Sequence, residues 1–134
     1  MGAWSEESYS NDDVWDALSK GGRDPRRIGQ VRVNVLVSNL FLSDKRDETK
    51  LGVTVFFLLR GMKVPREHLE GALKMARKLA GTKKYLREWV EPRKREAMLV
   101  WEAGQIERAL AHGCRGRKAY FAEDILANFA GGGK

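Results

Sequence analysis

The sequence is poor in cysteine and has no long apolar run, and each shortage excludes a class of protein. Its 134 residues contain one cysteine, Cys114, so no disulfide can form within the chain, as expected in a reducing compartment. No stretch of about 18 uninterrupted apolar residues is present, which argues against a transmembrane helix. The first residues lack the basic and apolar parts of a signal peptide. We therefore expect a cytoplasmic protein without a membrane partner.

Residues that bind metals or act as nucleophiles are also scarce. A zinc site needs about four ligands, whereas the chain has one cysteine and two histidines. His112 and Cys114 flank Gly113, too close along the chain for their side chains to meet easily as a catalytic pair. His68, between Glu67 and Glu70 on an amphipathic stretch, is interpreted as an exposed polar residue. The glycines of GGGK end the chain instead of opening a helix, so no phosphate-cradling loop is expected.

Three acids near the beginning are the one candidate metal or catalytic cluster. Asp12 and Asp16 lie four residues apart, with Asp13 between them, so two carboxylates on a helix would face one cation. Acids in the first turn of a helix also complement its dipole, and we favour that interpretation. The sequence thus predicts no metal, no cofactor and no catalytic residue, and hence a protein that is not an enzyme.

The composition is that of a globular protein. Hydrophobic residues make up 43% of the chain, and domains of this size bury roughly two-thirds of their surface. We expect one all-α domain over residues 1–134, a compact bundle of five to seven helices. Residues 1–10 would form an anchored N-terminal arm, and residues 131–134 a loose tail.

Helical patterns are clearest from residue 58 onward. Gly61 is typical of a helix C-cap, Pro65 of the first turn of the next helix, and Gly81 of its end. A short turn with Thr82 as its cap follows. A long helix is then expected from Pro92 to about residue 111, with an inner face of Leu99, Ala103, Ile106 and Leu110. A last helix would bury Phe121, Ala122, Ile125, Leu126 and Phe129.

The segment before residue 60 allows two structures. Valines at 31, 33, 35 and 37 alternate with other residues, as in a strand. A hairpin of residues 31–38 and 52–59 would give an α+β fold instead. The start Asp24-Pro25, a run of about seventeen residues and apolar residues around the whole circumference favour helices. We expect 31–42 and 51–59 to be central, buried helices. An earlier helix, capped by Ser10, would bury Val14, Trp15 and Leu18 and stop at Gly21-Gly22.

Positive charge is concentrated in one segment. Residues 74–95 hold nine basic and two acidic residues, which accounts for the entire net charge of +7. If the helices on either side pack antiparallel, these charges form one patch, with Tyr85 and Trp89 among them. Such a patch suits an acidic protein surface or the phosphates of a nucleic acid, and also a merely solvated face. The predicted patch comprises Lys74, Arg77, Lys78, Lys83, Lys84, Arg87, Arg93, Lys94 and Arg95.

The four tryptophans are expected to be core or interface anchors. Trp15 and Trp101 fall on helical faces and are assigned to the core. Trp4, together with Tyr85 and Trp89, is a predicted aromatic anchor.

The opening MGAW, followed by Tyr9 and Asn11-Asp12, resembles a group of small bacterial proteins of unknown function. These begin Met-Gly-Ala-Trp and have an aromatic-x-Asn/Asp-Asp segment soon after; position 5, often Gly in the group, is Ser here. The resemblance covers about the first eighteen residues and continues loosely in LREWVEPRKREAML. It implies a mostly helical domain whose arm is held down by Trp4, with Asn11-Asp12 shaping entry to the first helix. Burying one such side chain is worth roughly 2–3 kcal/mol.

The preferred function is non-enzymatic binding of an acidic protein through the patch of residues 74–95, compatible with an adaptor, inhibitor or immunity-type role in bacterial or phage conflict. Nucleic-acid binding through the same patch is the alternative, although no finger, basic zipper or RRM signature is present. A homo-oligomer is compatible with the sequence.

Overall fold

The computed structural model describes Val14, Ala17, Leu18 and residues 27–117 of the chain. Within residues 27–117 the backbone is mostly helical, and its only β-type pairing is an isolated bridge between Lys63 and Arg115. An all-α fold is therefore confirmed for this part, and the hairpin alternative is wrong because both of its segments are helices. The helices are α2 (Gln30–Leu42), α3 (Asp47–Leu59), α4 (Arg66–Ala80), α5 (Lys83–Leu86) and α6 (Pro92–Ala111).

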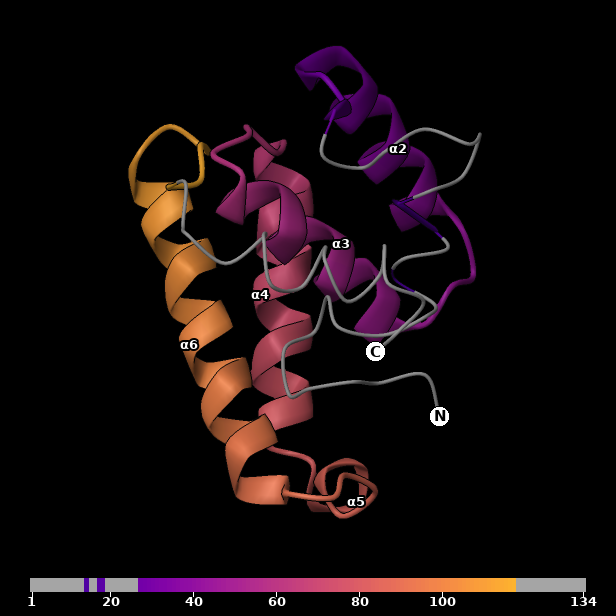
Figure 1. Cartoon of the computed structure of the whole chain (residues 1–134), viewed down its shortest axis with the longest axis vertical. Coiled ribbons are helices and arrows are strands. Elements are labelled where there is room, and N and C mark those ends of the chain that lie inside the picture. Colours follow the sequence, from indigo (N-terminus) through magenta and orange to yellow (C-terminus); the bar gives the residue numbers. More distant parts are fainter. Residues whose placement is uncertain (1–13, 15–16, 19–26, 118–134) are drawn as a thin grey trace.

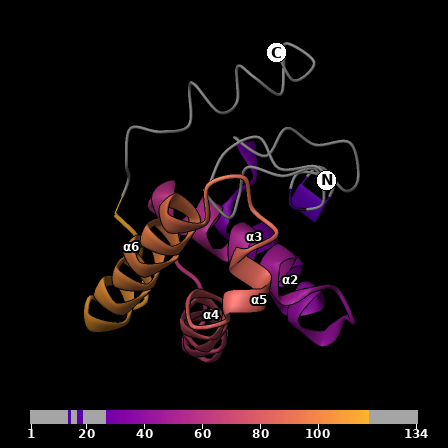
Figure 2. The ribbon, with the colours of Figure 1, turned by 90° about the horizontal axis from the view of Figure 1, so that it is seen from below.

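Helices α4 and α6 lie antiparallel and side by side, and the short α5 joins them at one end (Figure 1). Helix α3 packs against this pair, and α2 packs on α3 at the far edge (Figure 2). The buried side chains of these helices form one hydrophobic cluster. Helix α3 therefore lies between α2 and the α4–α6 pair, and α2 also touches α4 directly.

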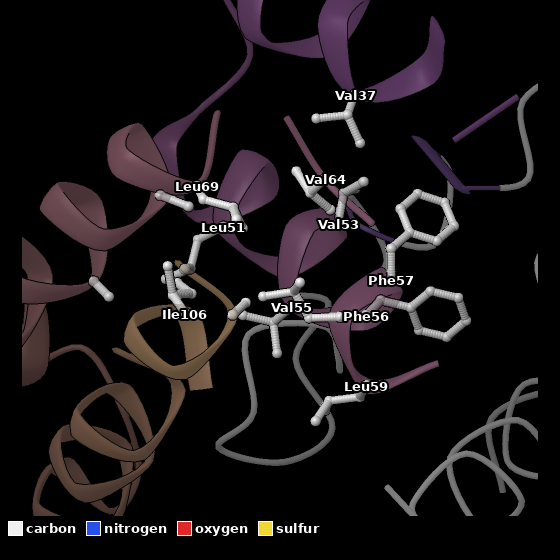
Figure 3. Close-up of a cluster of buried hydrophobic side chains, with 14 of the residues drawn as sticks. Val37, Leu51, Val53, Val55, Phe56, Phe57, Leu59, Val64, Leu69 and Ile106 are labelled. Carbon is white, nitrogen blue, oxygen red and sulfur yellow. The ribbon is translucent and has the colours of Figure 1, made fainter. Parts of the chain in front are cut away.

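Helix α3 is the centre of the molecule. Ten of its thirteen residues are buried, and they cover its whole circumference. Side chains from α2, α4 and α6, among them Val37, Leu69 and Ile106, converge on it (Figure 3). The prediction of a central, buried helix over residues 51–59 is confirmed.

Helix α2 differs from the expectation in where it begins and in how much of it is buried. It begins at Gln30, with Gly29 as its N-cap, because Ile28 and Gly29 are not helical. Only the face with Val33, Val37 and Leu40 is buried, whereas Val31 and Leu42 on the opposite face are 79% and 87% exposed. The prediction that residues 31–42 form a central helix was wrong, since α2 lies at the edge and packs along one side.

The ends of α3 and α4 follow the predicted signals. Gly61 adopts φ +78°, and its N–H donates to the carbonyl of Leu58 at 2.9 Å. The N–H of Met62 donates to the carbonyl of Phe57 at 3.0 Å, which completes a Schellman motif. Pro65 immediately precedes α4, and Gly81 caps its end.

The segment after α6 packs against the C-terminal end of α3. Cys114 has φ +66°; its N–H donates to Ala109 at 2.7 Å, and its carbonyl accepts from Val64 at 3.0 Å. Gly116 packs so closely that an added Cβ would lie 2.0 Å from the carbonyl oxygen of Leu58. Only glycine fits there, because the obstacle is backbone and cannot move aside.

Several sequence predictions lie outside the described residues: the N-terminal arm with Trp4, the cap at Ser10, Trp15, the restart at Asp24-Pro25, the helix around residues 121–129 and the tail at 131–134. Val14 and Leu18, predicted to share a buried helical face, are both helical and buried. Among the described helices, none combines the length and hydropathy needed to cross a bilayer.

Candidate functional site

Arg95 was predicted to belong to the surface patch, and the structure corrects this. The side chain is fully buried in the first turn of α6. Its Nε and Nη2 atoms donate to the hydroxyl oxygen of Tyr85 at 3.0 and 2.9 Å. Its guanidinium carbon lies 4.5 Å from the centre of the Trp89 ring, in a cation–π arrangement.

Tyr85 connects Arg95 to an acid on α3. Its hydroxyl donates to Oε2 of Glu48, and the same oxygen lies 3.8 Å from Nη2 of Arg95. Burial raises the pKa of Tyr85 and the hydrogen bond to Glu48 raises it further, against the lowering effect of the Arg95 charge. The phenol therefore keeps its proton and acts as a donor. We call Glu48, Tyr85, Trp89 and Arg95 the Arg95 cluster.

The Arg95 cluster fixes the turn between α4 and α6. Its members come from α3, α5, the link after α5, and α6, so the cluster ties three helices and the link together. The predicted aromatic anchors Tyr85 and Trp89 are thus engaged inside the protein, and Trp89 is only 8% exposed. Trp89 thus anchors the interior of the protein, while Tyr85 is half-buried, and a role for either ring in contacting a partner stays a prediction.

The other eight predicted basic residues are exposed. They occupy the last two turns of α4, α5, the link after it and the first turn of α6. Because α4 and α6 are antiparallel and α5 joins them, these segments meet at one end of the molecule (Figures 1 and 2). The eight are Lys74, Arg77, Lys78, Lys83, Lys84, Arg87, Arg93 and Lys94.

Three of the eight have acidic partners. Arg77 pairs with Glu107 of α6 at 2.5 Å. Lys78 lies 3.9 Å from Asp47 of α3, and Lys94 lies 3.1 Å from Glu91. The other five form no ion pair with any residue that the structure describes, and we call them the cationic surface: Lys74, Lys83, Lys84, Arg87 and Arg93.

The position of Arg93 and Lys94 on α6 opposes the helix dipole. The first turn of α6 contains no acid, and its N-terminus carries partial positive charge. Cations there cost about 0.3–1 kcal/mol each in helix stability. Arg77 and Lys78 differ, because they stand in the last turn of α4, where the dipole favours them.

The groups considered for catalysis do not come together among the described residues. His68 is half-buried, not exposed as predicted: its Nε2 lies 3.2 Å from the hydroxyl of Ser38, and its ring centre is 4.7 Å from that of Phe41. It therefore fastens α4 to α2. Cys114 is buried while His112 is exposed. No trio of His, Cys, Asp or Glu suited to a metal occurs among the described residues, and the acids at 12, 13 and 16 lie outside them.

Two residues of α6, Trp101 and Arg95, were misassigned from sequence, and the buried Glu102 was missed. Trp101, predicted to be core, is 44% exposed. Arg95 and Glu102 are buried on the same stripe as Leu99 and Ile106. Their spacing of three or four residues from those apolar positions was the available signal, but their charge outweighed it.

No family model, curated protein or solved structure matches the chain. The resemblance of the opening residues to the Met-Gly-Ala-Trp group therefore stays a prediction.

Proposed function

We propose that the protein binds an acidic surface of another protein through the cationic surface and performs no catalysis itself. The supporting observation is five exposed cations without ion-pair partners among the described residues, gathered where α4, α5 and α6 meet. Charges of one sign held together in this way raise association rates and select partners of the opposite sign.

The Arg95 cluster supports this proposal because it holds the charged turn in place. Lys83 and Lys84 share α5 with Tyr85, and Arg87 lies between Tyr85 and Trp89. A turn fixed by buried hydrogen bonds loses little conformational freedom when it binds. The cations at the start of α6 oppose the helix dipole, and a function in binding accounts for that cost in stability.

An acidic protein fits better than a single-stranded nucleic acid. Proteins that bind single strands stack bases on exposed aromatic rings. Tyr85 and Trp89, the aromatic residues within the basic segment, are instead turned inward against Arg95. An adaptor, inhibitor or immunity-type role is compatible with such binding.

The test compares three immobilised proteins: the wild type, the K83E/K84E variant, and R32E/K45E as a control with the same change in charge. Arg32 and Lys45 are exposed on α2 and the following loop, and neither belongs to the α4–α5–α6 segment that carries the cationic surface. Nuclease-treated lysate of the source cells is passed over each. We expect one acidic protein to be retained by the wild type and the control, and lost with K83E/K84E.

Direct titration with duplex and single-stranded DNA and RNA completes the test. Duplex binding at about 50 mM salt that falls steeply with salt and disappears in K83E/K84E would replace the proposal with nucleic-acid binding. Equal retention of the same proteins by all three baits would show that the cationic surface does not select a partner.

A further inference from the structure

The side of α6 that faces away from α3 and α4 has an apolar middle that none of the other described helices covers. Val100 and Trp101 are 61% and 44% exposed. A Cβ added to Gly104 would meet nothing within 4 Å, so open space adjoins this side of the helix. We define the α6 outer face by residues that recur at helical spacing: Arg93, Ala97, Val100, Trp101, Gly104 and Arg108.

Positive charge brackets this apolar middle. Arg93 and Lys94 stand at the beginning of the face and Arg108 at its end, roughly 22 Å further along the helix. The acid at position 107 lies to one side and is paired with Arg77. Beyond Arg108, an open hollow of about 510 Å³ is lined by Arg108, His112, Arg115, Gly116 and Arg117. Glu96, exposed one turn after Arg93, partly offsets the positive charge at the beginning of the face. The end around Arg108 is therefore the more cationic of the two and favours anionic groups more strongly.

We propose that the α6 outer face docks an acidic amphipathic helix of a partner protein. An apolar side chain of that helix would lie beside Trp101 in the space next to Gly104, with carboxylates at its two ends meeting Arg93 and the hollow around Arg108. The inference rests on the proposed function and specifies the partner's structure.

The shape and charge of the α6 outer face favour an acidic amphipathic helix over a second copy of the chain or a nucleic acid. Small residues at 97 and 104, seven positions apart, let a second helix approach closely along α6. A second copy of the chain would bring its own basic ends against these, since its net charge is +7. Nucleic acid would leave the exposed Trp101 and Val100 unmatched, because phosphates attract cations and not apolar side chains.

The probe is a synthetic fluorescein-labelled helical peptide with a central leucine stripe and glutamates at both ends. One control peptide has lysines in place of the glutamates, and another has glutamines in place of the leucines. Anisotropy titrations follow binding to the wild type, Trp101→Ala, Gly104→Gln and K83E/K84E. Circular dichroism verifies folding; both α6 substitutions fall at exposed positions, and Gln is the better helix former than Gly.

We expect the acidic leucine peptide to bind at least about tenfold more weakly to Trp101→Ala and Gly104→Gln than to the wild type, as for an interface hot spot. Both control peptides should bind poorly. Absence of binding to the wild type, or equal binding of the lysine peptide, would overturn the inference. If only K83E/K84E lost binding of the peptide, and the two α6 variants kept it, the inference would also be overturned, while the proposed function would remain intact. Self-association of the wild type that Trp101→Ala abolishes would assign the face to a second copy.

Discussion

Arg93, Lys94 and Arg95 are consecutive but occupy three environments. Arg93 is exposed without an ion-pair partner among the described residues, Lys94 pairs with Glu91, and Arg95 is buried on Trp89. Composition cannot separate them, because burial of a guanidinium depends on partners such as Glu48 that are remote in sequence. The basic segment itself could be identified from the sequence, whereas its division into surface and interior could not.

Arg95→Ala should lower the free energy of unfolding by about 3 kcal/mol, because it removes two hydrogen bonds to Tyr85 and the buried cation beside Glu48, which then keeps only Arg46 as a nearby cation among the described residues. Arg95→Lys should recover little, since an ammonium cannot reproduce the flat, forked contact. Urea denaturation measures both. Lys94→Ala, one position earlier and exposed, is the control and should change stability by about 0.5 kcal/mol or less. Equal effects of the two alanine substitutions would deny the cluster its structural role.

Tyr85 should make stability fall with rising pH in the alkaline range. Its pKa is raised above the ordinary 10.0, so above that pH the unfolded chain loses the phenol proton while the folded protein retains it. The contribution is complete below about pH 10 and declines above it. Urea midpoints of the wild type and Tyr85→Phe should therefore differ by a constant amount below about pH 10 and draw together between about pH 10 and pH 12. A constant difference between the two across that range would contradict a raised pKa.

At the scale of elements, terminating residues predicted better than hydrophobic periodicity. Pro65, Gly81 and Pro92 marked the ends of α4 and the start of α6 correctly, because their backbone restrictions act locally. The valines of α2 were ambiguous since they occupy both faces of the helix. Tertiary packing decides which face of α2 meets α3. Because the exposed outer face of α2 is also apolar, the sequence predicted a central helix where the structure has an edge helix.

The two faces of α2 should differ sharply in how much the same substitution destabilises the protein. Val33→Asp places a charge in the core and should lower the free energy of unfolding by at least about 3 kcal/mol. Val31→Asp, on the exposed face, should change it by about 0.5 kcal/mol or less. Thermal and urea unfolding distinguish them. Comparable losses would mean that the outer face of α2 is covered in solution.

At the scale of the whole molecule, the cations at the start of α6 that we propose for binding lower the stability of the helix that carries them. The prediction that helices on both sides of the basic segment bring its charges to one end agrees with the antiparallel α4–α6 pair, but the binding function stays a prediction. The candidate site was found in outline because charge is visible in a sequence. The outer face of α6 was missed because exposure of Trp101 depends on which way the helix is rotated.

Arg93→Glu should stabilise the fold and weaken binding. Replacing a cation by an acid in the first turn of α6 should raise the free energy of unfolding by about 0.5–1 kcal/mol at low salt, through the helix dipole. The same change should reduce binding of the acidic leucine peptide. Denaturation at low and high salt, with titration of the peptide, measures both effects. A loss of stability would show instead that Arg93 supports the fold.

The wrapping of α3 also has a consequence for synthesis on the ribosome. Its apolar circumference leaves the exit tunnel before α4 and α6, which cover much of it, have been made. A nascent chain that ends near residue 80 would present α3 partly uncovered, in a state prone to aggregation. Folding must therefore be completed after translation has passed α6. Until then, chaperones can bind the uncovered apolar surface of α3.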